Sequence, residues 1–209
     1  MSSSPARLFV IAAPSGAGKT TLVKLLLDRN SGLEFSVSYT TRKKRNTEVE
    51  GRDYFFVDEQ RFLQLREEGE LLESAEVFGN YYGTSRSQVE QQLDKGKHVI
   101  LEIDWQGARQ VRESMPDAIR IFILPPSLAE LERRLRDRRT DSNEVIARRL
   151  HEARGDMTHW DEFDFVIVNE DLDAAVSELE AILNGDGDAN LSSNPELQAR
   201  LERIIDADS

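Results

Sequence analysis

Cysteine is absent from the 209 residues of this chain. Its absence excludes disulfide bridges and metal sites with Cys ligands. Histidine is nearly as scarce, and the three that occur lack the spacing of a metal site. We therefore assign no chemistry to His98, His151 or His159.

Long apolar runs are missing as well. No stretch of 18 consecutive apolar residues occurs, so no part of the sequence is predicted to span a membrane. Residues 1–5 lead directly into the first predicted strand and lack the apolar segment of a secretory signal peptide. From these absences we expect a cytoplasmic protein that works without a membrane.

Positive charge is in deficit, because 27 Lys and Arg face 39 Asp and Glu and the net charge is −12. A general nucleic-acid binder is therefore disfavoured, since the phosphate backbone would be repelled. The arginines are nevertheless clustered between residues 133 and 149: Arg133, Arg134, Arg136, Arg138, Arg139, Arg148 and Arg149. Such a basic island on an acidic chain indicates a small anionic ligand.

A phosphate-binding loop is the strongest motif that is present. The apolar run 8–12 predicts a buried strand, a Gly-rich turn follows, and Gly18-Lys19-Thr20 opens a helical pattern. Small residues let backbone N–H groups surround a polyphosphate, and the helix N-terminus adds partial positive charge. Lys19 can reach the β- and γ-phosphates, and the Thr20 hydroxyl can ligate Mg²⁺.

The loop departs from the strict pattern G-x-x-x-x-G-K-[ST] at one place, where Ala13 replaces the first glycine. The alternative interpretation is a Gly-rich turn before an ordinary helix. The strand before the loop and the helix after it favour phosphate binding. The residues expected to contact the phosphates are Ala13, Pro14, Ser15, Gly16, Ala17, Gly18, Lys19, Thr20 and Thr21.

Apolar runs alternate with helical patterns over most of the chain. The predicted strands are 8–12, 99–103, 119–124 and 165–168, and the predicted helices are 19–29, 105–114, 127–137, 143–157 and 171–183. Continuous apolar strands suit a sheet that is covered on both faces. The fold class predicted is α/β, with a parallel sheet and helices on both of its faces.

Residues 35–96 interrupt this alternation. Residues 35–41 have the period of a strand, residues 54–57 are short and aromatic, and two further strand-like segments flank a turn at 78–80. We predict an inserted, mostly antiparallel β module. The nucleotide-binding core is then 5–34 with 97–184.

The last residues differ again in composition. Residues 185–190 resemble a linker, and Asn194-Pro195 can start a helix with an apolar stripe of Leu197, Leu201, Ile204 and Ile205. This 185–209 tail either docks on its own core or frays, which is the favoured interpretation, or contacts a second subunit in a homo-oligomer.

Five motifs together carry a family resemblance. They are residues 14–20, 38–45, 51–54, 79–84 and 103–107, and their order and spacing closely resemble guanylate kinase. The resemblance covers about residues 7–183. It implies a P-loop enzyme that transfers a phosphoryl group from MgATP to GMP, with an inserted GMP-binding module and a helical lid at 134–150.

The resemblance also implies the residues that bind GMP. Arg42 and Arg45 would clamp its phosphate, as forked guanidinium groups can, and Tyr54 and Tyr82 would donate hydroxyl hydrogen bonds to it. Both tyrosines could instead be core residues with satisfied hydroxyls. The guanine base would be bound by Ser38, Glu73 and Thr84. Glu102 and Asp104 end an apolar strand and would also belong to the GMP site, where they could bind a metal through water, orient an arginine or contact the guanine pocket.

The resemblance assigns the transferring phosphoryl to Lys19, Arg42 and three lid arginines, Arg134, Arg138 and Arg149. Asn169 follows a core strand and would lie near the ATP base. Two alternatives remain open: a guanylate-kinase-like module that only binds proteins, and another small-molecule kinase of the same fold. An enzyme is favoured over the binding module by Gly16, Gly18, Lys19, Thr20 and the lid arginines. GMP is favoured over another acceptor by the set Arg42, Arg45, Glu73, Tyr82 and Thr84.

Overall fold

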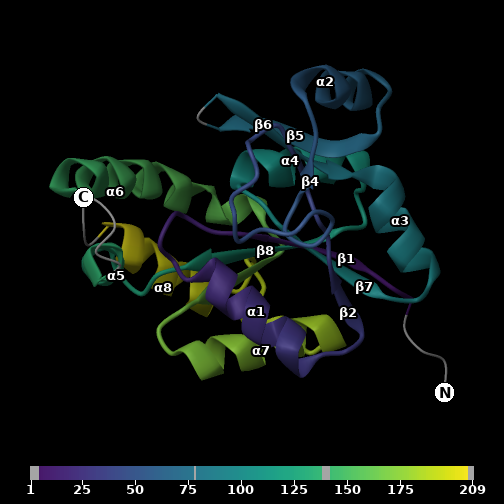
Figure 1. Ribbon diagram of the computed structural model, residues 1–209. Helices are drawn as coiled ribbons and strands as arrows, with labels where there is room; N and C mark the ends of the chain where they lie inside the picture. The colour runs from purple at the N-terminus through teal and green to yellow at the C-terminus, as the bar shows by residue number, and fades with distance from the viewer. Residues whose placement is uncertain (1–4, 78, 138–141, 207–209) are drawn as a thin grey trace. The chain divides into compact units, whose positions relative to one another are not determined.

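The computed structural model describes residues 5–77, 79–137 and 142–206. Its main sheet has five strands in the order β2 (Leu33–Phe35), β7 (His98–Glu102), β1 (Leu8–Ala12), β8 (Ile119–Leu124) and β9 (Phe165–Val168). Both β2 with β7 and β8 with β9 pair in parallel. The predicted α/β class with a parallel central sheet flanked by helices is thereby confirmed (Figure 1).

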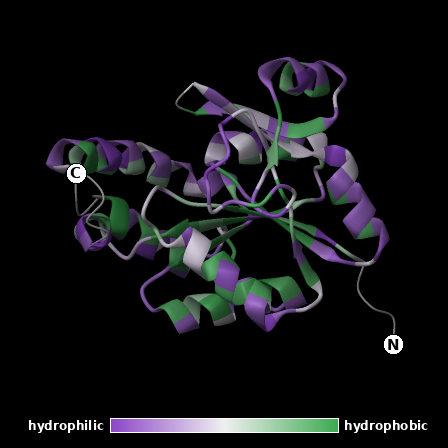
Figure 2. Cartoon of the chain, viewed as in Figure 1, coloured by the Kyte–Doolittle hydropathy of each residue, from purple (hydrophilic) through white to green (hydrophobic). Residues whose placement is uncertain are grey.

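The strands of this sheet are apolar throughout because both faces are covered. All five residues of β1 are buried, and Figure 2 colours the central strands as mainly hydrophobic. Four of the five strands lie where the sequence predicts them. The fifth, β2, was not predicted as a strand of this sheet, because it has only three residues and runs into the alternating pattern of 35–41.

The five predicted helices are present as α1 (Lys19–Arg29), α4 (Trp105–Ser114), α5 (Leu128–Asp137), α6 (Asn143–Met157) and α7 (Leu172–Asn184). Two of them start one residue later than predicted because the preceding residue caps the helix from outside. Ser127 Oγ accepts a hydrogen bond from Glu130 N, and Asp171 Oδ1 accepts one from Ala174 N. None of the helices in the described ranges is long and apolar enough to cross a membrane.

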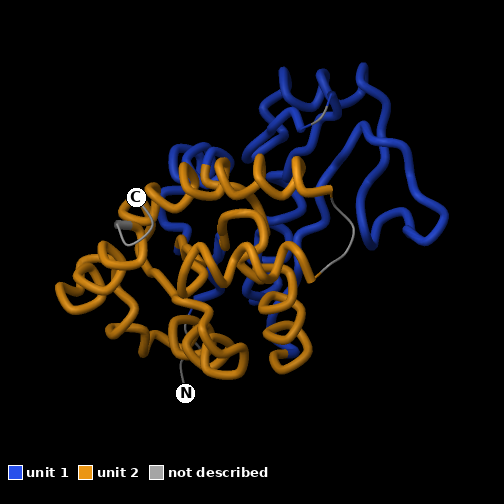
Figure 3. The backbone as a smooth tube through the Cα atoms, turned by 90° about the vertical axis from the view of Figure 1, so that its left-hand side faces the viewer, with its two compact units in different colours: residues 1–10, 31–101, 106–119 blue, residues 11–30, 102–105, 120–209 orange. Residues whose placement is uncertain are grey.

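Backbone contacts divide the chain into two compact units (Figure 3). Unit 1 comprises residues 1–10, 31–101 and 106–119, and unit 2 comprises 11–30, 102–105 and 120–209. Strand β1 begins in unit 1 and ends in unit 2. The domain boundaries at 34, 96 and 184 stay a prediction.

A second sheet lies within unit 1, with strand order β4 (Phe55–Phe56), β3 (Tyr39–Thr40), β6 (Asn80–Ser85) and β5 (Leu71–Val77). Strands β5 and β6 form an antiparallel pair, as expected for the inserted module. The alternating segment 35–41 is not one strand: Phe35 ends β2 and Tyr39 begins β3. Two helices were not predicted from the sequence: α2 (Glu59–Glu67), capped by Asp58, and α3 (Arg86–Asp94), capped by Ser85.

The C-terminal segment packs on unit 2. A short 3₁₀ helix (Asp188–Asn190) places the Asn190 amide where its Nδ2 donates to Val166 O at 3.2 Å and to Glu178 Oε2 at 2.6 Å. Helix α8 (Pro195–Asp206) follows, and its Leu201 is fully buried. Of the interpretations offered for this tail, docking on the chain's own core is what the structure shows for Leu201.

Candidate active site

The turn between β1 and α1 has the backbone of an anion-binding loop. Gly16 and Gly18 adopt φ values of +95° and +97°, a region that side chains other than glycine rarely enter. Gly18 stands at the N-cap of α1 and provides no side-chain cap. The positive end of the helix is therefore left to an incoming anion.

Lys19 is the cation of this loop. Its Nζ donates to the carbonyl oxygen of Ile103 at 2.6 Å. Burial lowers the pKa of Lys19, while the carboxylates of Glu102, Asp104 and Asp156 oppose that shift. The ammonium is thus held by a neutral oxygen, and the nearby carboxylates favour its charged form. A phosphate oxygen can replace the Ile103 carbonyl oxygen as its partner.

Thr20 lies beside the same strand end, and its Oγ1 donates to Glu102 Oε1 at 2.5 Å. A hydroxyl and carboxylates are the hard oxygen donors that Mg²⁺ prefers. Within the described ranges no group of three His, Asp or Glu side chains could hold a metal by itself. These residues fit a Mg²⁺ ion that takes one ligand from Thr20 and the rest from phosphates and water, the usual mode for this ion.

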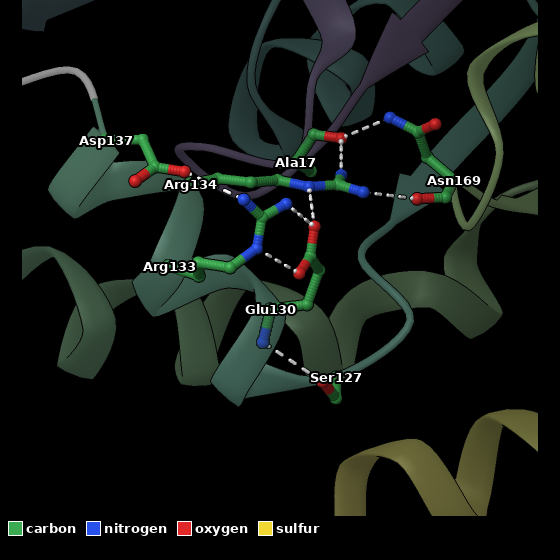
Figure 4. A network of polar contacts seen from close by, with 7 residues as sticks. All are labelled: Ala17, Ser127, Glu130, Arg133, Arg134, Asp137 and Asn169. Atoms are coloured by element: carbon green, nitrogen blue, oxygen red, sulfur yellow. Dashed lines mark hydrogen bonds and ion pairs between the residues drawn. The ribbon is translucent and has the colours of Figure 1, made fainter.

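A side-chain network fastens the loop from behind (Figure 4). Arg134 NH1 donates to Ala17 O at 3.3 Å and Arg134 NH2 to Asn169 O at 2.9 Å. Asn169 is buried, and its Nδ2 donates to Ala17 O at 2.8 Å. A Cβ on Gly18 would come within 2.5 Å of that Nδ2, so this position requires glycine.

Glu130 orients the arginines of this network. Its Oε1 accepts from Arg134 Nε at 2.8 Å, and its two oxygens accept from Arg133 at 2.7 Å each. The contacts with Arg133 and then Arg134 lower the pKa of Glu130 to about 2. Beside the network a pocket of about 440 Å³ is lined by residues that include Gly16, Arg134 and Asn169.

A second set of polar side chains gathers in unit 1. Arg42 donates to both oxygens of Glu48, from NH2 to Oε1 at 2.7 Å and from NH1 to Oε2 at 3.1 Å. Its guanidinium lies 5.3 Å from the centre of the Tyr54 ring. The hydrogen bond to Glu48 is the main reason why the pKa of Arg42 is raised, and the Tyr82 hydroxyl adds to it.

Glu73 and Thr84 form the buried part of this set. They face each other across β5 and β6, and Thr84 Oγ1 donates to Glu73 Oε1 at 2.7 Å. Glu73 is only 6% exposed. A carboxylate at this depth requires polar partners, because an unpaired buried charge is costly.

Comparison with known proteins shows the family of this chain. The family model described as guanylate kinase matches residues 5–186. The chain belongs to the guanylate kinase family. It is 58% identical to the guanylate kinase of Aromatoleum aromaticum over 179 residues, which cover 86% of this chain and 88% of that protein.

Two further relatives extend the match. The guanylate kinase of Pseudomonas fluorescens is 48% identical over 205 residues, 98% of each chain. The crystal structure of guanylate kinase from Anaplasma phagocytophilum superposes with a TM-score of 0.70, at 37% identity over 96% of this chain and 95% of that one. The predicted family and fold are thereby confirmed.

The residues predicted to bind ATP lie together in unit 2. The loop from Ala13 to Thr21, Arg134 and Asn169 belong to one connected set. Arg149 lies on α6, and Arg138 falls outside the described residues. Glu102 and Asp104, predicted to help bind GMP, lie in unit 2 beside Lys19, whereas Glu73 and Thr84 lie in unit 1; their role toward GMP stays a prediction.

The remaining residues predicted to bind GMP lie in unit 1. The Tyr54 and Tyr82 rings are 6.0 Å apart in an edge-to-face arrangement. Ser38 accepts from Phe55 N through its carbonyl oxygen at 2.9 Å. Arg45 is exposed, and its backbone N–H donates to Glu48 Oε2 at 2.7 Å.

Sequence analysis missed two carboxylates that hold these cations in place. Glu130 precedes Arg133 and Arg134 by three and four residues on one helix, a spacing that predicts ion pairs and could have identified it. Glu48 follows Arg42 by six residues within an irregular segment. No periodicity marks such a pair, so the tertiary structure was needed to find it.

Proposed function

We propose that this protein transfers the γ-phosphoryl group of ATP to GMP, reversibly, giving ADP and GDP. The observation that carries the proposal is the loop itself, in which Lys19 and a helix N-terminus without a side-chain cap are available to bind a polyphosphate. Hydrogen bonds from Arg134 and Asn169 hold the loop in this conformation. Membership of the guanylate kinase family supports the choice of GMP as acceptor.

The loop would bind the β- and γ-phosphates of ATP. Backbone N–H groups of residues 13–21 surround them, and Lys19 exchanges its contact with Ile103 O for a phosphate oxygen. The pocket of about 440 Å³ beside Asn169 is the place for the nucleoside. Mg²⁺ held through Thr20 would supply neutralisation of phosphate charge.

No general base is required for the acceptor. The attacking atom is an oxygen of the GMP phosphate, which is largely ionised at neutral pH. Catalysis then depends on placing that oxygen in line with the γ-phosphorus and on neutralising the charge that develops in transfer. Lys19, Arg42, Arg134, Arg138 and Arg149 are the cations that we assign to this work.

The unit 1 set would bind GMP. Arg42, oriented by Glu48, would bind the GMP phosphate through guanidinium N–H groups that Glu48 does not occupy, together with Arg45 and the hydroxyls of Tyr54 and Tyr82. Glu73 would accept from N1–H and the exocyclic NH₂ of guanine, with Ser38 and Thr84 on its other polar atoms. A part of Glu102 and Asp104, which lie in unit 2, in GMP binding stays a prediction. Adenine offers no such pair of donors, so the buried Glu73 carboxylate would gain fewer hydrogen bonds from it than from guanine, a loss of about 1–3 kcal/mol.

The remaining assignments are proposed on the same basis. ATP and GMP are the proposed partners, and neither nucleic acid nor a membrane has a part in the reaction. A cytoplasmic location and a homo-oligomer stay predictions.

A direct assay tests the proposal. ADP production from MgATP is measured with GMP, AMP, CMP and UMP offered separately. We expect turnover with GMP and at least about 100-fold less with AMP, as for a site built on paired polar groups. Folded protein that binds GMP without turnover would instead support a non-catalytic binding module, and turnover with another acceptor would support a different kinase.

A further inference from the structure

One cluster of unit 2 has no role assigned so far beyond the charge that its Asp156 carboxylate adds near Lys19. Trp105 Nε1 donates to Asp156 Oδ1 at 2.9 Å. The Trp105 ring stacks on His159, with ring centres 3.6 Å apart and planes at 18°. His159 Nδ1 in turn lies 2.7 Å from Glu162 Oε1. The cluster joins the start of α4, the end of α6 and the turn that follows it.

The cluster reaches the phosphate loop through one short segment. Trp105 is the residue after Asp104 and two after Ile103, whose carbonyl oxygen receives the Lys19 ammonium. Glu102, which accepts from Thr20, begins this segment. A contact that holds Trp105 in place therefore also limits movement of the acceptors that hold Lys19 and Thr20.

Asp156 stands at a position that local preferences disfavour. It lies in the last turn of α6, where a negative charge meets the negative end of the helix. It is also half-buried, and desolvation raises its pKa. Neither effect stabilises a carboxylate here. The hydrogen bond from Trp105 is the largest interaction that does, and nearby positive charge, including the Lys19 ammonium, adds to it.

The position of Asp156 is linked to that of a lid arginine by helix geometry. Residues 149, 153 and 156 follow one another at spacings of four and three, so they share one face of α6. Ala153, between the other two, is fully buried, so this face is turned inward. Fixing the rotation of α6 at Asp156 consequently fixes the direction of the face that carries Arg149.

We propose that Asp156 is a positioning residue that, through its hydrogen bond with the Trp105 indole, sets the rotation of α6 and so holds Arg149 on the side of the nucleotide phosphates. His159, stacked on Trp105 and paired with Glu162, supports the indole from its face. The proposal rests on the proposed function, because Arg149 acts on a phosphoryl group only there.

A double-mutant cycle between positions 156 and 149 tests this role. ATP affinity is measured by titration calorimetry, and turnover with GMP is measured in parallel, for the wild type, D156A, R149A and D156A/R149A. We expect D156A to lower turnover about 10-fold with little change in the KM for GMP. R149A lowers ATP affinity and turnover by some factor in the wild type. In the D156A background that factor should be smaller by about 5-fold or more, as for residues that act together.

Three variants separate positioning from simple destabilisation. W105F removes the N–H donor but keeps a ring to stack on His159, so it should reproduce the D156A effect. D156N keeps an oxygen that accepts the bond and should restore turnover to within about 3-fold of the wild type. The exposed Asp161 provides the control D161A, for which we expect less than about 2-fold change.

The outcomes are decisive in both directions. An R149A penalty that is equal in the two backgrounds, or a D156N variant as impaired as D156A, would overturn the positioning role. If D156A does not fold, the cycle is run with W105F in its place. Absence of GMP turnover in the wild type would refute the proposed function, while the coupling in ATP affinity would still decide the role of Asp156.

Discussion

The two units hold the cations that we propose to bind phosphate in different ways. In unit 2, Lys19 is held by a backbone carbonyl, and the loop around it is fastened by Arg134 and Asn169. In unit 1, Arg42 is paired with a carboxylate, Glu48, through both of its terminal nitrogens. The first cation is kept available for a ligand that replaces a neutral contact, whereas the second is oriented by a charged partner.

This difference suits Lys19 to neutralising charge and Arg42 to orienting a bound phosphate. A compact ammonium beside a carbonyl can follow a phosphoryl group as it moves. A planar guanidinium fixed by Glu48 presents one edge in a defined direction, which suits binding of a stationary phosphate. Loss of Lys19 should therefore impair the chemical step, and loss of Glu48 should impair acceptor binding.

The largest expected effect is that of Lys19→Ala. Removing the loop cation should lower kcat by at least about 10²–10³-fold, because charge on the transferring phosphoryl is left without its cation. Steady-state assays with GMP, together with circular dichroism to confirm folding, check it. Near-normal turnover would contradict the phosphate-loop assignment.

The next prediction concerns base recognition in unit 1. Glu73→Gln should lower kcat/KM for GMP about 10–100-fold, because the amide can no longer accept two hydrogen bonds from guanine. ATP affinity, measured by calorimetry in the same samples, should stay within about 2-fold. An equal loss for both nucleotides would show that Glu73 does not recognise the base.

A matched pair of glycines compares backbone and side-chain constraints. Gly18→Ala should destabilise the protein by about 1–3 kcal/mol, since a Cβ there combines a φ of +97° with a contact at 2.5 Å to Asn169. Gly69→Ala, at φ +72° with no atom within 4 Å of the new Cβ, should cost only about 1 kcal/mol. Denaturant unfolding measures both, and equal losses would show that the Asn169 contact relaxes freely.

The smallest effect is a pH dependence. Contact with Arg42, then with the Arg45 backbone, lowers the pKa of Glu48 to about 2 from an ordinary value of 4.5. A carboxylate with a lowered pKa contributes stability that is complete above 4.5 and is lost as the pH falls toward 2. The unfolding free energy of the wild type should therefore fall more steeply over this range than that of Glu48→Gln. Parallel curves would show that the pair adds no net stability.

Much of this protein could be predicted because its signals are local in the sequence. The core strands are apolar runs, the helices have periodic patterns, and the loop from Ala13 to Thr21 is a contiguous motif. Each of these depends on residues within a few positions of one another. The strand β2 and the helices α2 and α3 were missed, because a three-residue strand and two short helices carry weak patterns.

The sequence by itself determined the α/β class, the family and the phosphate loop, since these depend on contiguous patterns of apolar residues, glycine and Lys19-Thr20. Only the tertiary structure decided that Asn169 and Arg134 fasten that loop, that Glu48 orients Arg42, and that Asp156 contacts Trp105. The contact of Asn169 with Ala17 and that of Asp156 with Trp105 each join residues more than 50 positions apart, and no spacing rule connects residues that only folding brings together.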